Sequence, residues 1–247
     1  MIGTPHSHER TTRSTNERAR ALAGAGAPHG TLVTAAEQTA GRGRQGRRWL
    51  AEPGDALLMS LVVRERAETL ALLPLRAAVA VRDACAALTG GASLIKWPND
   101  IWIDGRKVAG ILIEGRPAEG WAVLGIGLNV RTRRFPDGLA TPATSLALAG
   151  TDVTVATARD EVLSALEGWL EADAGAVIEA WRAHDALAGQ PVTWNGGSGT
   201  AAGVGDDGSL LVDTPDGARV ELGAGEVHLG RDQGPGSGCS RRSPETR

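Results

Sequence analysis

The pattern of the chain changes near residue 189, and this change limits the folds that it can adopt. Before that point, apolar runs of strand length alternate with longer apolar segments of helical spacing. From Gly189 to Leu229 there are only short β-prone runs, punctuated by Asp-Gly pairs at 207–208 and 216–217. We therefore expect an α/β (α+β) domain with a mixed sheet and flanking helices. A small β-barrel of about 40 residues should follow and pack on it, since such a barrel is near the lower size limit for independent folding.

Turn and capping residues place the elements of these two domains. The Asp104-Gly105 pair is a strong hairpin signal, and Ser14-Thr15-Asn16-Glu17 fits a capping box at the start of a helix. The predicted helices span residues 15–23, 75–88, 154 or 157 to 170, and 174–188. The predicted strands span 31–36, 56–63, 93–96, 101–103, 107–114 and 120–130 in the large domain, and 191–194, 199–204, 209–213, 219–222 and 226–228 in the small one.

Both ends of the chain are expected to be tails. Residues 1–13 are polar, and His6 and His8 on such a terminus are expected to belong to a disordered segment rather than to a metal site. Residues 231–247 are rich in Gly, Ser and Arg and lack the apolar content that orders a chain. The expected domains are therefore 14–188 and 189–230.

Charge and cysteine content argue against several classes of protein. The net charge of −3 and the pI of about 6.0 leave no overall basic footprint for nucleic acid. Cys85 and Cys239 are far apart and have no metal or disulfide spacing, which favours a reducing cytoplasm. No apolar run reaches about 18 residues, so neither a membrane span nor a signal peptide is expected.

Two lysines stand out against an arginine-rich background. Lys and Arg number 26, yet the only lysines are Lys96 and Lys107. A position that remains Lys in such a chain indicates a need for a compact point charge, which can contact one phosphate or carboxylate oxygen without a planar fork. Chance placement is the alternative. The neighbouring segments, 96–100 (KWPND) and 105–110 (GRKVAG), do not have the pattern of a charged helix face, which favours a site.

The segment 41–49 (GRGRQGRRW) is the densest basic stretch of the chain. Its glycines let the backbone approach a ligand closely, and a loop of this kind wraps anions. A phosphate-clamping loop, a short RNA contact and a plain solvated loop are all compatible with the motif. The chain has neither a Walker loop nor a strand followed by G-x-G-x-x-G and a helix, so a nucleotide would need a different fold.

Five segments, taken together and in this order, resemble the motif series of biotin protein ligases. They are 14–16 (STN), Gln38 with 41–49, 96–100, 107–114 (KVAGILIE) and 125–130 (GIGLNV). The resemblance covers about residues 14 to 230. It implies a catalytic domain related to class II aminoacyl-tRNA synthetases followed by an SH3-like barrel. Only 13 residues precede Ser14, too few for the N-terminal DNA-binding domain of some members, so the short form without repressor function is expected.

The resemblance implies a two-step reaction. Biotin and ATP with Mg²⁺ give biotinyl-5'-AMP, and the biotinyl group is then transferred to a lysine of a biotin carboxyl carrier domain of an acyl-CoA carboxylase. Like charges at contact distance need cations between them, and Arg42, Arg44 and Lys107 are the expected catalytic residues. No DNA binding, no membrane binding, and a monomer or weak homodimer in the cytoplasm are expected.

The resemblance also assigns site residues one by one. For biotin these are Ser14, Thr15, Asn16, Gln38, Arg42, Gly43, Arg44, Lys107 and Gly110. For ATP they are Arg42, Arg44, Trp49, Lys96, Asn99 and Asn129, and for Mg²⁺ the residue is Asp100.

Four of these residues have a plain structural alternative. Ser14 can cap a helix, and Trp49 can anchor a core instead of stacking on adenine. Asp100 can form a turn, and Lys96 can position that turn rather than contact phosphate.

Three other functions compete with the biotin ligase. A lipoate or octanoate ligase shares the fold and the reaction logic but lacks this combination of motifs. A catalytically dead paralogue would bind biotin only, although no required residue is missing. An RNA-binding module would use the arginine loop, and thermal protection by biotin plus ATP but not by an oligonucleotide distinguishes it.

Overall fold

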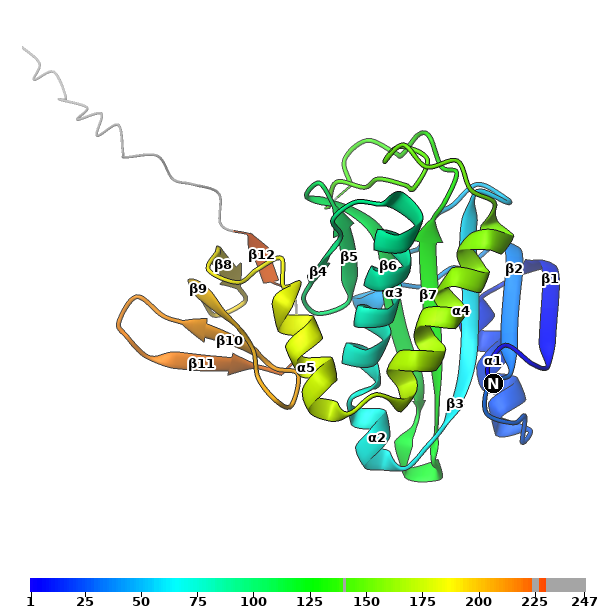
Figure 1. The fold of residues 1–247 in the computed structure, drawn as a ribbon, viewed down its shortest axis with the longest axis horizontal. Coiled ribbons are helices and arrows are strands. Elements are labelled where there is room, and N and C mark those ends of the chain that lie inside the picture. Colours follow the sequence, from blue (N-terminus) through cyan, green and yellow to red (C-terminus); the bar gives the residue numbers. More distant parts are fainter. Residues whose placement is uncertain (140, 224–226, 230–247) are drawn as a thin grey trace, which may run out of the picture.

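The fold is that of a computed structural model, which describes residues 1–139, 141–223 and 227–229. Figure 1 shows a large part, in which a sheet is flanked by helices, and a smaller all-β part beside it. None of the described helices is both long enough and apolar enough to cross a membrane.

The large part is built on a seven-stranded sheet with the order β1-β2-β3-β7-β6-β5-β4. Its strands are β1 (His6–Thr12), β2 (Leu32–Gln38), β3 (Ala56–Arg64), β4 (Leu94–Lys96), β5 (Asp100–Ile103), β6 (Arg106–Arg116) and β7 (Trp121–Asn129). β1 pairs with β2 in parallel, and every other neighbouring pair is antiparallel. The Asp104-Gly105 turn joins β5 to β6, as the hairpin signal predicted, and both of its residues have positive φ.

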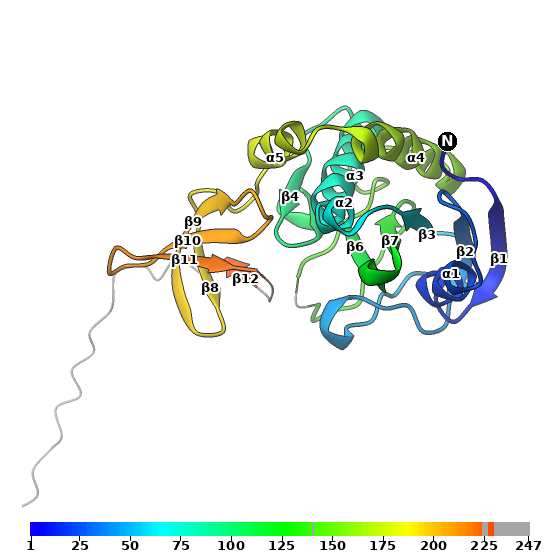
Figure 2. The ribbon, with the colours of Figure 1, turned by 90° about the horizontal axis from the view of Figure 1, so that it is seen from below.

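Helices cover both faces of this sheet (Figure 2). One face is covered by α3 (Leu73–Thr89) and α4 (Val155–Glu171), with α2 (Ala67–Ala71) and α5 (Ala174–Ala183) at their ends. The other face carries α1 (Thr15–Gly24). β3 is buried along almost all its length because it lies between these layers, which explains its nearly continuous apolar run.

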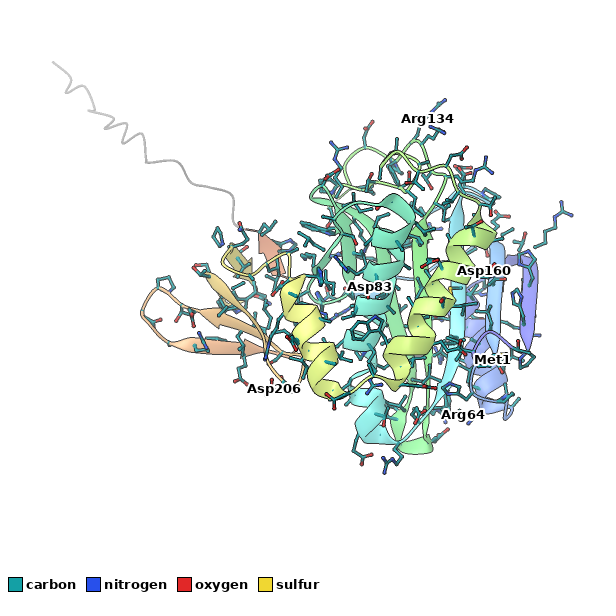
Figure 3. All side chains as sticks on the ribbon, viewed as in Figure 1. Met1, Arg64, Asp83, Arg134, Asp160 and Asp206 are labelled. Atoms are coloured by element: carbon teal, nitrogen blue, oxygen red, sulfur yellow. The ribbon has the colours of Figure 1, made fainter. Side chains whose placement is uncertain are left out.

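Side-chain bonds tie the helical layer together. Asp83 on α3, which is labelled in Figure 3, accepts through Oδ2 from the Trp169 indole on α4 at 2.8 Å. At the end of α5, Arg182 contacts the smaller part through two groups, donating from Nε to the Val204 carbonyl at 2.8 Å and pairing with Asp206 at 2.9 Å.

The smaller part is a five-stranded antiparallel sheet with the order β11-β10-β9-β8-β12. Its strands are β8 (Pro191–Trp194), β9 (Gly197–Val204), β10 (Leu210–Asp213), β11 (Arg219–Leu222) and β12 (Val227–Leu229). Its buried residues, such as Val212 and Val227, belong to the same hydrophobic cluster as the core of the large part. The expectation that this unit packs on its neighbour is therefore confirmed.

The N-terminal segment differs from the expectation of a disordered tail. His6–Thr12 form β1, whose backbone pairs with β2, and this explains why a polar segment is ordered. His6 Nε2 and His8 Nδ1 each lie 2.8 Å from the buried Thr34 hydroxyl, so both rings are fixed against β2. The predicted tail at 231–247 lies outside the described residues.

The last predicted helix is also shorter than expected. α5 ends at Ala183 rather than at residue 188. The following residues pair with β4 instead, because Ile95 N donates to the His184 carbonyl and Ala186 N donates to the Ile95 carbonyl. This turn brings Asp185 into the junction between the two parts.

Asp185 generates a prediction about the pH dependence of stability. Burial raises its pKa to about 6, although backbone hydrogen bonds from Leu187 and Ala188 oppose the change. Asp185 Oδ2 is buried and has no hydrogen-bond partner among the described residues. In the folded protein the Asp185 carboxyl group therefore keeps its proton at pH values where the same group in the unfolded chain has lost it. The contribution of Asp185 to the free energy of unfolding falls as the pH rises from about 4 to about 6 and then stays low.

We expect Asp185→Asn to raise the free energy of unfolding at pH 8 by about 1–3 kcal/mol and to change it little at pH 4. The Asn oxygen can still accept from Leu187 N, which bonds Asp185 Oδ1 at 2.8 Å. Denaturant titrations at the two pH values measure this, with the exposed Asp152 changed to Asn as control. The prediction would be contradicted if the difference in free energy of unfolding between Asp185→Asn and the wild type were no larger at pH 8 than at pH 4.

Candidate active site

One cavity collects the predicted site residues, with the exception of Asn129. Its lining residues come from the start of α1, from the arginine-rich segment 41–49 and from β3, β6 and β7, among others. Figure 2 shows that α1 and the segment between β2 and β3 lie on the same face of the sheet. The predicted residues that line the cavity are Ser14, Thr15, Asn16, Gln38, Arg42, Gly43, Arg44, Trp49, Lys96, Asn99, Asp100, Lys107 and Gly110.

A polar network forms one end of this cavity. Gln38 Oε1 accepts from Thr15 N at 2.7 Å and from the Thr15 hydroxyl at 3.1 Å. Below them, Ser60 Oγ lies 2.8 Å from Thr15 Oγ1 and 2.6 Å from Asn16 Oδ1. Ser60 was missed by the sequence analysis, although a single hydroxyl in an apolar buried strand is a usable signal. The network fixes the start of α1 against β2 and β3.

The predicted capping box is wrong in its side-chain contacts. Ser14 has the extended backbone of an N-cap residue, but its hydroxyl makes no capping hydrogen bond within the described part of the chain. Gln38 instead accepts from the first-turn amide of Thr15, and Glu17 pairs with Arg13 at 3.6 Å. The Ser14 side chain lines the cavity, which favours its interpretation as a ligand contact.

Asn16 is held firmly by the protein itself. Its amide nitrogen donates to the Leu112 carbonyl at 3.2 Å and to Glu114 Oε2 at 2.9 Å. The side chain lies directly on Gly125 of β7, where a Cβ atom would come within 2.1 Å of Asn16 Oδ1. Both amide hydrogens are thus used internally, so Asn16 shapes the pocket at least as much as it can contact a ligand.

Trp49 packs on two glycines in the wall of the cavity. Gly110 on β6 and Gly127 on β7 are register partners, and an added Cβ would lie 3.1 Å from the indole at Gly110 and 2.5 Å from it at Gly127. The Lys107 ammonium lies 5.7 Å from the ring centroid. Trp49 Nε1 is buried without a hydrogen-bond partner among the described residues. The ring is therefore part of the cavity wall, while adenine stacking stays a prediction.

Positive charge dominates the rest of the lining. Among the described lining residues, Asp100 is the only one with a carboxylate, and its Oδ1 lies 2.6 Å from Lys107 Nζ. The cationic lining residues are Arg42, Arg44, Arg47, Arg48, Lys96 and Lys107.

The pKa values reflect this crowding. Burial lowers the pKa of Lys96, Asp100 opposes the shift, and the neighbouring Lys107 and arginines lower it further. Burial likewise lowers the pKa of Arg44, with Asp100 opposing and Arg47 adding to the effect. A bound anion would relieve the repulsion among these cations, so the cavity is suited to a polyanionic ligand.

Comparisons with known proteins agree with these observations. Residues 8–130 match the model of the biotin/lipoate A/B protein ligase family, and residues 188–230 match the biotin protein ligase C terminal domain. The bifunctional ligase/repressor BirA of Bacillus subtilis is 36% identical over 236 residues, covering 88% of this chain and 71% of that protein. The biotin--[acetyl-CoA-carboxylase] ligase of Mycobacterium tuberculosis is 36% identical over 238 residues, covering 88% and 86%. The chain belongs to the biotin protein ligase family.

Solved structures of the family have the same fold. The biotin protein ligase from Aquifex aeolicus, in complex with biotin and ATP, has a TM-score of 0.79 and 28% identity, covering 93% of this chain and 100% of that one. The resemblance found in the sequence motifs is therefore confirmed at the level of family and fold.

Not every residue assigned through the biotin protein ligase motifs reaches the cavity. Asn129 is buried, does not line the cavity, and donates from Nδ2 to the Thr144 carbonyl at 2.9 Å. The segment around Thr144 covers this end of β7, because Thr144 N donates to the Lys107 carbonyl and Leu146 N donates to the Asn129 carbonyl. Asn129 thus supports the strand ends, and its assignment to ATP stays a prediction.

Lys96 and Asn99 line the cavity but already have protein partners. Lys96 Nζ donates to the Val227 carbonyl of β12 at 2.6 Å, a contact that neither interpretation of Lys96 included. Asn99 Nδ2 donates to the Ile111 carbonyl at 2.7 Å, which holds the turn against β6. Val227 and His228 also line the cavity. Their distance along the chain left no local signal for this role.

The packing of Trp49 on Gly127 generates a second prediction. In Gly127→Ala the added methyl overlaps the indole, so Trp49 must move, at a cost on the order of 1–3 kcal/mol. Because the cationic lining suits a polyanionic ligand, we expect the affinity for a triphosphate probe such as ATP to fall by about tenfold or more. Isothermal titration calorimetry measures it.

Gly168→Ala is the matched control for this change. An added methyl at Gly168 meets nothing within 4 Å, and alanine favours the interior of α4 by about 1 kcal/mol. This variant should bind as the wild type does and be at least as stable. Unchanged affinity in Gly127→Ala would show that the indole position does not matter for binding.

Proposed function

We infer that this protein is a biotin protein ligase that activates biotin as biotinyl-5'-AMP and transfers it to a lysine of a carrier protein. One observation carries the inference. The polar network at the start of α1 and the cationic group around Lys107 face a single cavity, so a neutral polar ring and a charged phosphate chain fit side by side. Family membership and the matching C-terminal domain support the same activity.

The first step needs charge neutralisation more than a protein nucleophile. The biotin carboxylate attacks the α-phosphorus of ATP and pyrophosphate leaves, so two anions must come into contact. Lys107 lines the cavity, 2.6 Å from Asp100 Oδ1 and 5.7 Å from the Trp49 ring centroid, and we propose that it contacts both reacting groups. Arg42 and Arg44 would share the remaining negative charge. Fixed cations in a partly enclosed site can supply most of the rate enhancement by positioning and electrostatics.

The ring of biotin is assigned to the polar end of the cavity. Gln38 Oε1 is used by Thr15, so its Nε2 group is the donor that remains for a ureido oxygen. Ser14 supplies a hydroxyl from the N-cap position. Asn16 holds this arrangement, and Gly43 and Gly110, which also line the cavity, are assigned to the biotin side.

Asp100 is the residue that fits Mg²⁺ best. Mg²⁺ on ATP usually takes one or two carboxylates together with phosphates and waters, so a single carboxylate in the cavity wall is sufficient. No cluster of three or more potential metal ligands occurs among the described residues. When bound, the ion supplies neutralisation of the phosphates. Asp100, whose Oδ1 lies 2.6 Å from Lys107 Nζ, would be the protein ligand that holds the ion.

The second step defines the partner. The amine of the acceptor lysine attacks the acyl carbon of the mixed anhydride, and AMP leaves. We propose that this lysine belongs to a biotin carboxyl carrier domain of an acyl-CoA carboxylase. We further propose that the enzyme acts in the cytoplasm as a monomer or weak homodimer and does not bind DNA.

The direct test is biotin-dependent exchange of labelled pyrophosphate into ATP. We expect exchange with biotin and Mg²⁺, because the first step is reversible as long as the adenylate stays bound. Lipoate and octanoate are the matched controls and should support little exchange. Equal exchange with lipoate or octanoate would indicate the rival ligase, and no exchange with any acid would indicate a protein that only binds.

Lys107→Arg tests the role of the ammonium. Arginine keeps the charge but places a larger planar group between Asp100 and Trp49, where the ammonium lies 2.6 Å from Asp100 Oδ1. We expect exchange activity to fall about 100-fold, the scale for losing one preorganised donor to a developing charge. The neighbouring exposed Arg106, changed to Lys, is the control and should keep full activity. A nearly active Lys107→Arg enzyme would return Lys107 to the chance interpretation.

A further inference from the structure

Glu114 joins three segments around the cavity although it does not line it. It lies near the end of β6, and its side chain is only 23% exposed. Its Oε2 accepts from Asn16 Nδ2 at 2.9 Å. Its Oε1 lies 3.3 Å from Arg20 Nη1 on α1 and 3.6 Å from Arg42 Nη1 on the arginine-rich segment. One carboxylate therefore contacts α1, the segment 41–49 and β6.

The two oxygens face different parts of the proposed site. Oε2 meets Asn16, whose other contacts, to the Leu112 carbonyl and to Ser60, fix the polar network. Oε1 meets two guanidinium groups that compete for the same atom. Both side chains are exposed, but Arg42 lines the cavity, whereas Arg20 lies on α1 outside it.

Backbone contacts connect Arg42 to the rest of the segment 41–49. Arg42 and Arg48 form an isolated antiparallel bridge, Gly43 N donates to the Arg47 carbonyl at 2.8 Å, and Trp49 N donates to the Gly41 carbonyl at 3.0 Å. These bonds close the segment into a small loop, so a displacement of Arg42 also displaces Arg44 and Trp49. Most residues of this loop are exposed to solvent.

We propose that Glu114 is a positioning residue that couples the biotin-ring pocket to the arginine-rich loop. Its Oε2 holds Asn16 and its Oε1 holds Arg42, so the loop stays over the cavity when the polar network is in place. The reactive adenylate is then shielded from water until the carrier lysine arrives. This role rests on the proposed function, and it adds a group outside the cavity that determines how long the intermediate is kept.

Glu114→Gln separates charge from shape. Glutamine has the same size and still offers an oxygen to Asn16, but it loses the attraction to both guanidinium groups. The polar network should therefore stay intact while the loop loosens. Two measurements test this. The first is the rate of tryptic cleavage within residues 42–48, followed by mass spectrometry. The second is the time for which labelled biotinyl-adenylate stays bound to the enzyme.

We expect cleavage within 42–48 and release of the adenylate to become about fivefold faster in Glu114→Gln, the size expected from an ion pair of this exposure. The KM for biotin should change much less, because Asn16 keeps its acceptor. Wild-type rates for both readouts would overturn the proposal, as would an equal loss of biotin affinity and loop protection.

Two matched variants distinguish positioning from general loosening. Arg20→Gln removes the competitor for Oε1, so its loop should be protected at least as well as that of the wild type. Glu119→Gln breaks an exposed 2.7 Å pair with Arg116 at the nearby turn and should leave both readouts unchanged. If Arg20→Gln loosens the loop as much as Glu114→Gln does, Glu114 only secures α1 and the proposal is wrong.

The test also separates this proposal from the proposed function. Tryptic cleavage of the ligand-free protein reports on the Glu114–Arg42 contact whether or not the protein is a ligase. Absence of biotin-dependent pyrophosphate exchange in the wild type would refute the function alone, whereas normal exchange with unchanged cleavage in Glu114→Gln would refute the coupling alone.

Discussion

Close approach of side chains to the sheet is the constraint on which this site depends. On the cavity face of β6 and β7, Gly110, Gly125 and Gly127 leave the backbone bare, and Asn16 and Trp49 lie directly on it. A Cβ at Gly125 or Gly127 would come within 2.1 or 2.5 Å of these side chains. The glycines therefore bring α1 and the arginine-rich loop toward the same surface, and this convergence creates a cavity with one polar and one cationic end.

The electrostatic imbalance of the cavity follows from the same convergence. Cations from the loop, from β4 and from β6 are brought together, and Asp100 is the acidic lining residue among those described. Glu114 offsets Arg42 from outside the lining, and Asp100 offsets Lys107 within it. Burial is the largest cause of the lowered pKa values of Lys96 and Arg44, and repulsion from neighbouring cations adds to it while Asp100 opposes it. A cavity of this kind is suited to phosphate, because its cations are already gathered in the folded protein.

Local motifs predicted most of the fold and most of the assigned residues that line the cavity, and the failures share a cause. Turn pairs and apolar runs placed the strands well, because those signals depend on neighbouring residues. His6–Thr12 looked like a tail because an edge strand with polar side chains has no apolar pattern, and its order comes from pairing with β2. The capping hydrogen bond of Ser14 was wrong because Gln38, which lies farther along the chain, accepts from the first-turn amide. Asn129 lies outside the cavity lining and bonds the Thr144 carbonyl, a contact that no local pattern predicts. Val227 was missed because only tertiary packing brings it to Lys96.

The segment 96–100 shows how one short motif connects the two parts of the molecule. Lys96 donates to the Val227 carbonyl on β12, and the Trp97 indole donates to the Gly208 carbonyl in the turn between β9 and β10, so both acceptors belong to the smaller part. In the larger sheet, Asn99 donates to the Ile111 carbonyl of β6, and Asp100 pairs with Lys107. Because the two sheets also share one buried core, displacement of β12 would disturb Lys96 directly and Lys107 through Asp100. The smaller sheet is therefore a wall of the cavity, and its packing contributes to the position of the charges that act on the phosphates.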